Sequence, residues 1–86
     1  MSIGQVVFAK AGRDKGDAFV VILLQNEYLY LVDGKRRTLD KPKKKKAKHV
    51  QPVNYISDVV AECRTLQDAD IRKELKLFAT RLSQIS

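Results

Sequence analysis

Short β-forming runs separated by turn residues fill the first part of the chain, and this pattern most restricts its fold. Apolar side chains alternate along residues 5–10 (QVVFAK), which places Val6 and Phe8 on one face of a strand and their neighbours on the other. Residues 11–17 (AGRDKGD) combine two glycines with four charged side chains and therefore predict a surface turn.

Two more strands are predicted after this turn. Residues 18–24 (AFVVILL) are continuously apolar, as expected for a central strand buried on both faces. The pair Gln25-Asn26 suits the next turn, and residues 27–34 (EYLYLVDG) alternate again, with the tyrosines on one face and the leucines on the other. The Asp33-Gly34 pair favours positive φ and so predicts a tight turn.

The remaining strands are predicted in the basic segment and just after it. We expect a fourth strand at residues 35–39 (KRRTL) and a fifth at residues 47–53 (AKHVQPV). Pro42 lies between them and has no N–H for a strand ladder, so it marks an edge or a boundary.

Beyond Pro52 the pattern changes to helical. Ser57 or Asp58 is placed to cap a short helix (SDVVAEC), and a longer helix is predicted over residues 69–82. Its apolar side chains recur at helical spacing and form one face: Ile71, Leu75, Phe78 and Leu82. Such a face either packs on the β-domain or binds a partner, and we favour packing within the chain.

Positive charge is concentrated in one segment. The 86 residues contain 17 Lys or Arg against 10 Asp or Glu, a formal charge of +7, and nine of these basic residues lie within residues 35–49, where Asp40 is the one acid. A charge run of this kind is either a solvated loop or a contact surface for an anion such as nucleic acid.

A known motif is similar to the N-terminal half. Gly4-Gln5-Val6-Val7-Phe8, Gly12, Lys15-Gly16-Asp17 and Val20-Val21-Ile22 follow one another as in a KOW motif, in which a strand, a glycine-bearing loop and a second strand form part of a small SH3-like barrel. With LVDG at residues 31–34, its basic continuation and KHVQPV at residues 48–53, the chain resembles bacterial KOW-domain RNA-binding proteins related to the fourteenth large-subunit ribosomal protein of eukaryotes and archaea. The likeness covers residues 3–54.

This resemblance implies that residues 1–54 form a five-stranded SH3-like barrel. Together with the helical pattern that follows, it leads us to expect a mainly β fold whose C-terminal α segment, residues 55–86, packs on the barrel as one structural unit. The implied partner is RNA, with structured ribosomal RNA favoured and the ribosome or its proteins as further partners. Gly16 corresponds to the motif's glycine, whereas the glycine that many KOW motifs carry where Ala18 or Phe19 follows the loop is absent.

The candidate RNA-binding residues lie in the glycine-bearing loop and the basic segment: Lys10, Arg13, Lys15, Gly16, Arg36, Arg37, Lys41, Lys43, Lys44, Lys45, Lys46, Lys48 and His49. Lysines suit the phosphate backbone, and arginines add bidentate contacts or stack on an exposed base.

Two groups of side chains allow a different interpretation. Arg13 and Lys15 alternate with acidic residues and could form solvated local ion pairs instead of RNA contacts. Tyr28 and Tyr30 could stack on bases, but their spacing on a strand favours half-buried packing.

The same sequence argues against several other classes of protein. A chain of 86 residues buries too little surface for a deep substrate cavity, and neither Cys63 nor His49 has a catalytic partner or a set of metal ligands at recognisable spacing, so we predict no enzyme activity, cofactor or metal. The longest apolar run has 7 residues, far short of the roughly 20 that cross a bilayer. With no secretory pattern, we expect a cytoplasmic protein without a membrane partner.

Two alternatives to RNA binding stay open at this point. The longer helix could present its apolar face to a protein of the transcription or translation machinery, which would make the chain an adaptor. The polybasic tract could also serve as a lipid tether or a nuclear-import signal.

Overall fold

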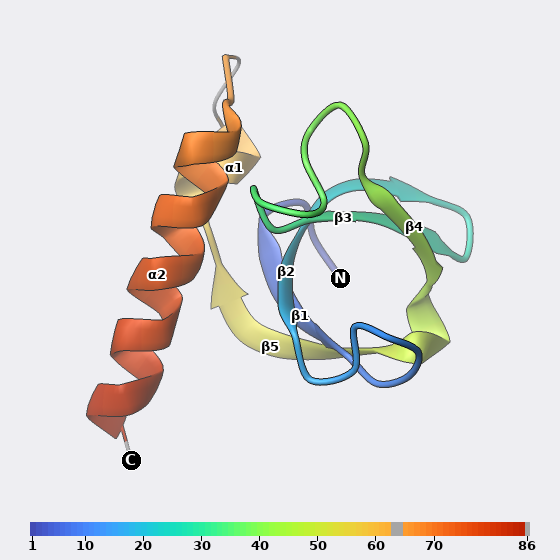
Figure 1. Ribbon diagram of the computed structural model, residues 1–86, viewed down its shortest axis with the longest axis horizontal. Helices are drawn as coiled ribbons and strands as arrows, with labels where there is room; N and C mark the ends of the chain where they lie inside the picture. The colour runs from blue at the N-terminus through green and yellow to red at the C-terminus, as the bar shows by residue number, and fades with distance from the viewer. Residues whose placement is uncertain (63–64, 86) are drawn as a thin grey trace.

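A computed structural model describes residues 1–62 and 65–85 of the chain. Its elements are β1 (Gln5–Ala9), β2 (Ala18–Gln25), β3 (Tyr28–Val32), β4 (Lys43–Lys46), the 3-10 helix η1 (Ala47–His49), β5 (Val50–Ile56), α1 (Asp58–Glu62) and α2 (Asp68–Ile85). The strands form one antiparallel sheet of order β4-β3-β2-β1-β5 (Figure 1). The predicted content of five strands followed by helices is confirmed.

The sheet is strongly curved. It bends round in Figure 1 so that its two edge strands, β4 and β5, approach each other with η1 between them. Irregular register in β1 and β2 contributes to the bend, because a bulge increases the local twist of a strand. β4 and β5 are not neighbours in the hydrogen-bonded order, so the described strands form an open sheet.

Each face of the sheet carries a hydrophobic core. The inner core contains Val7, Ala9, Phe19, Val21, Leu29, Leu31 and Val50. The outer core joins the sheet to the helices through Val6, Val20, Val32, Val60, Ile71 and Phe78. Successive residues of β1 therefore enter different cores, which confirms the predicted alternation along that strand.

β2 is buried on both faces only in its first half. Phe19, Val20 and Val21 are buried as predicted, but Leu23 and Leu24 are 47% and 39% exposed. These two leucines lie next to the hairpin turn, beyond the residues of the outer core. The turn itself falls one residue later than predicted, since Gln25 pairs with Tyr28 across it.

The fourth strand also lies later than predicted. Residues 35–39 form a loop, and β4 is the lysine run itself. The reason is the Asp33 carboxylate, whose Oδ1 accepts the backbone N–H groups of Lys35 at 2.8 Å and Arg37 at 2.9 Å. These local bonds fold residues 33–37 into a turn and remove the N–H groups that a strand would use. The fifth strand, predicted at residues 47–53, begins only at Val50, because residues 47–49 form η1. β5 continues to Ile56, past the predicted end of the β-domain at residue 54.

α2 packs on the outer face of the sheet, as the helical spacing predicts. Ile71 and Phe78 are buried, and the Phe78 ring lies 5.9 Å from the ring of Phe8 and 5.3 Å from that of Tyr55 between centroids. Leu82 belongs to the predicted apolar face but is 49% exposed. Because Ile71 and Phe78 are in the core, the face that an adaptor would offer is already covered.

A serine joins the two helices. Ser57 caps α1, since its Oγ accepts the Val60 N–H at 3.2 Å, and the same hydroxyl donates to Oε1 of the buried Glu74 in α2. The sequence offered Ser57 or Asp58 as the cap, and the structure assigns it to Ser57. Cys63, the last residue of the predicted short helix SDVVAEC, lies outside the described residues. None of the described helices combines the length and the apolar character that spanning a bilayer requires.

Replacing Ser57 with alanine is expected to lower the free energy of unfolding by about 1–3 kcal/mol, because the helix loses its cap and a buried carboxylate loses a donor. Urea denaturation followed by circular dichroism measures this loss. The control is Thr80→Ala, which removes an exposed hydroxyl that donates to the Lys76 carbonyl and should have little effect. Equal stability of the two variants would contradict the buried bond between the helices.

Candidate nucleic-acid interface

The four lysines of β4 project alternately to the two faces of the sheet. Residues paired across an antiparallel ladder share a face. On the inner face Lys43 pairs with Leu31 and Lys45 with Leu29, and on the outer face Lys44 pairs with Tyr30 and Lys46 with Tyr28. A run that is continuous in sequence therefore supplies two separate surfaces.

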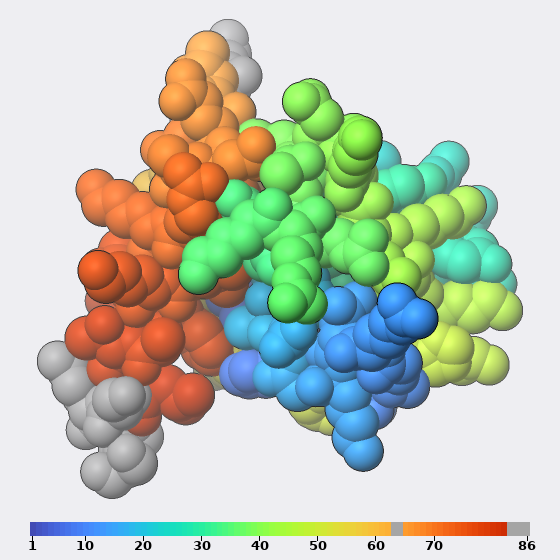
Figure 2. Space-filling model, viewed as in Figure 1, coloured from blue at the N-terminus to red at the C-terminus, as the bar shows by residue number. Residues whose placement is uncertain are grey.

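The inner lysines line an open pocket of about 350 Å³, which we call the basic pocket. Four segments contribute to it: the loop after β1, the loop before β4, β4 itself and η1. Its lining residues are Ala11, Gly12, Arg13, Asp14, Arg37, Lys43, Lys45 and His49. In Figure 2 the loop after β1, in blue, lies against the green segment that leads into β4.

Specific contacts hold the walls of the basic pocket together. Lys45 Nζ donates to the Ala11 carbonyl at 2.8 Å and so links β4 to the loop after β1. Arg37 Nη2 lies 3.6 Å from Oδ2 of the buried Asp14. The backbone N–H of Lys10 donates to the His49 carbonyl at 2.9 Å and fixes η1 beside the end of β1.

The charge balance of the basic pocket suits an anion. Arg13, Arg37, Lys43 and Lys45 provide four cations against the single carboxylate of Asp14. That carboxylate pairs with Arg37, so it orients one cation and leaves the others uncompensated at the pocket. Clusters of arginine and lysine of this kind bind the phosphate groups of nucleic acids through charge-assisted hydrogen bonds.

The outer lysines form a different surface around Tyr28. Lys44 Nζ lies 4.5 Å and Lys46 Nζ 5.8 Å from the centroid of the Tyr28 ring, within the range of cation–π attraction. Tyr28 and Tyr30 are half-buried, as predicted. The association of lysine with tyrosine was not predicted, because it depends on the register of a strand that the sequence placed elsewhere.

The other predicted RNA-binding residues lie outside the basic pocket. Lys10, Lys15, Gly16, Arg36, Lys41 and Lys48 are exposed on the surrounding loops and on η1. Gly16 has a φ of +89°, and nothing lies within 4 Å of the position that a Cβ would take. Glycine at this position is therefore explained by the backbone conformation of the turn, not by a close approach within the chain.

Asp14 belongs to the basic pocket but was not among the candidates from the sequence. Local ion pairs with Arg13 or Lys15 were one interpretation of its loop, whereas in the structure Asp14 pairs with Arg37 from a distant loop. No sequence signal links these two positions.

No protein-family model matches this sequence, and no curated protein matches it significantly, so the likeness to KOW proteins depends on the motif residues quoted above. Within residues 1–62 and 65–85, no three His, Cys, Asp or Glu side chains gather as a metal site would need.

Proposed function

We propose that this chain is a noncatalytic RNA-binding protein that holds an RNA backbone at the basic pocket. The observation that carries the proposal is the convergence of five predicted RNA-binding residues, from segments far apart in sequence, on one open pocket: Arg13, Arg37, Lys43, Lys45 and His49. An open pocket rimmed by cations suits a chain of phosphates that passes across it.

The resemblance to KOW proteins selects RNA among the possible anions. Residues 11–14 of the KOW-like loop line the basic pocket, so part of the motif and the charge cluster belong to the same surface. The proposal includes the finer fold class, an SH3-like barrel, for which the curved sheet with η1 between its edge strands is the supporting feature. Structured ribosomal RNA, on the ribosome or during its assembly, is the RNA class that the resemblance favours.

Salt dependence provides the first test of RNA binding. If the four cations of the basic pocket each neutralise one phosphate, the logarithm of affinity should fall against the logarithm of salt concentration with a slope of about 2.8 for single-stranded RNA. Fluorescence anisotropy with a labelled oligonucleotide, repeated over a series of KCl concentrations, measures this slope. An affinity that does not change with salt would contradict the proposal.

Paired variants of β4 then locate the RNA. Lys43→Gln with Lys45→Gln should weaken binding and reduce the slope by about 1.4, because two phosphate contacts are lost. The matched control, Lys44→Gln with Lys46→Gln, removes the same charge from the same strand on its opposite face and should have the smaller effect. Equal losses would mean that RNA responds to overall charge and not to the basic pocket. Thermal unfolding of each variant checks that the fold is retained.

A further inference from the structure

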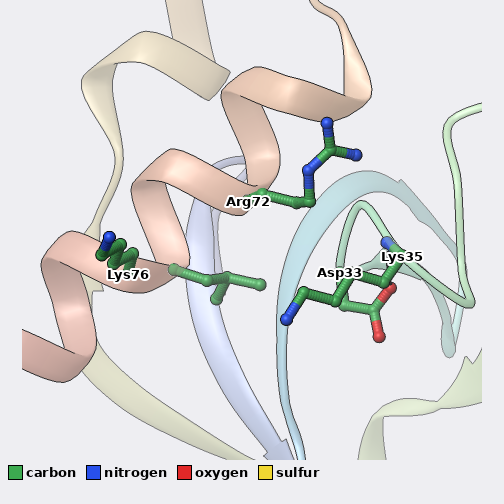
Figure 3. Close-up of a pocket in the computed structure, with 5 residues that line it drawn as sticks. Asp33, Lys35, Arg72 and Lys76 are labelled. Atoms are coloured by element: carbon green, nitrogen blue, oxygen red, sulfur yellow. Dashed lines mark hydrogen bonds between the residues drawn. The ribbon is translucent and has the colours of Figure 1, made fainter.

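A second cationic pocket lies between α2 and the turn at residues 33–37. Its volume is about 410 Å³, and Asp33, Lys35, Arg72, Leu75 and Lys76 line it. We call it the helix pocket. In Figure 3, Arg72 projects from α2 beside the turn that carries Asp33 and Lys35, while Lys76 lies one helical turn further along α2 and farther from that turn. None of these five residues was among the candidates from the sequence.

The helix pocket has fixed walls. Asp33 holds the turn through the two backbone N–H groups that its Oδ1 accepts. Arg72 Nη1 donates to the Gly34 carbonyl at 2.6 Å and so bonds the turn to α2. Arg72 and Lys76 are four residues apart and therefore lie on the same face of the helix.

The chemistry of the helix pocket combines positive charge with an apolar surface. Three cations face a single carboxylate, that of Asp33, which is already bonded to the backbone. Leu75 is partly buried and supplies the apolar part of the lining of the helix pocket. A nucleotide has matching parts, since it carries an anionic phosphate and a flat base that gains from contact with an apolar surface.

One turn connects the helix pocket to the basic pocket. Lys35 lines the helix pocket and Arg37 lines the basic pocket. Arg36 between them lines a third hollow of about 380 Å³, together with Lys35 and the acidic Asp17 and Asp33. The three consecutive cations mark a path across the surface from one pocket to the other. Figure 2 shows the green segment that contains this turn lying between α2 and the rest of the sheet.

We propose that RNA held at the basic pocket continues across this turn into the helix pocket. There one unpaired nucleotide places its base against Leu75 and its phosphate against Lys35 and Lys76. This inference rests on the proposed function. It adds a second contact point and a preference for RNA with an unpaired nucleotide at that point.

Charge-neutral variants test the phosphate contact. Lys76→Gln should reduce the salt slope for a fluorescein-labelled oligouridylate by about 0.7, and adding Lys35→Gln should bring the reduction to about 1.4. Lys73→Gln is the matched control, because Lys73 is an exposed lysine of the same helix that lines neither pocket. It should leave the slope unchanged.

Photo-crosslinking tests the position of the base. With 4-thiouridine in the same oligonucleotide, mass spectrometry should find crosslinks in the part of α2 that contains Leu75. One outcome separates the two proposals: Lys43→Gln with Lys45→Gln weakens binding, but Lys35→Gln with Lys76→Gln has no more effect than Lys73→Gln. This outcome would overturn the RNA contact at the helix pocket and leave the proposed function standing. A reduced slope without crosslinks in α2 would overturn the base contact. Absence of salt-dependent binding by the unmodified protein would overturn both proposals.

Discussion

Replacing Phe78 with alanine is expected to lower the free energy of unfolding by about 3–5 kcal/mol. The side chain is 5% exposed and packs edge-on against Tyr55 and at a tilt against Phe8, so its removal leaves a cavity between α2 and the sheet. A domain of this size has a total stability of about 4–13 kcal/mol, and the loss is therefore a large part of it. Urea denaturation followed by circular dichroism measures the change.

Leu82→Ala is the control for Phe78→Ala. Leu82 lies on the same predicted stripe of the same helix but is 49% exposed, so its truncation should cost no more than about 0.5 kcal/mol. Similar effects of the two substitutions would mean that α2 does not pack on the sheet as described. The face containing Ile71 and Phe78 would then be free for a protein partner, as the adaptor hypothesis requires.

Local signals account for the parts of the fold that the sequence predicted well. Period-two alternation placed Val6 and Val7 in different cores, and helical spacing identified Ile71 and Phe78 as the buried face of α2. These patterns succeed because the two periods are fixed by backbone geometry. Leu82 shows their limit, since the apolar spacing continues to a side chain that is 49% exposed.

Features that depend on tertiary contacts were not predictable in the same way. Four consecutive lysines have no strand pattern, and β4 forms because β3 offers an edge and because Asp33 holds the preceding residues in a turn. The division of the lysines between two faces follows from that register. The pairing of Asp14 with Arg37 has no local signal at all.

The helix pocket was hidden for a different reason. Residues 50–86 contain equal numbers of acidic and basic side chains, so the net charge gave no reason to expect an anion site there. The structure removes that balance locally, because Glu74 is buried with Ser57 while Arg72 and Lys76 line the helix pocket. Net charge over a segment therefore conceals a charged surface whenever one sign is buried.

Gly34→Ala is expected to destabilise the protein by about 3–4 kcal/mol, the combined effect of a disfavoured backbone conformation and a steric overlap. Gly34 has a φ of +80°, and a Cβ there would lie 2.6 Å from the Asp68 carbonyl oxygen and 2.7 Å from the Arg72 side chain. The overlap is with the backbone of α2, so it cannot be relieved by a rotamer change. Thermal and urea denaturation measure the loss.

The Gly16→Ala variant separates the cost of the backbone conformation from the cost of the steric overlap. Gly16 has nearly the same backbone conformation, with a φ of +89°, but nothing within 4 Å of a Cβ, so this variant should lose only about 1–2 kcal/mol. The difference between the variants is the cost of pushing the turn away from α2. Because that turn carries Lys35 to one pocket and Arg37 to the other, Gly34→Ala should also reduce the salt slope for RNA under conditions where the protein is folded. Equal destabilisation by the two substitutions would show that the turn at residues 33–37 does not contact α2. This result would contradict the proposed course of RNA from the basic pocket to the helix pocket.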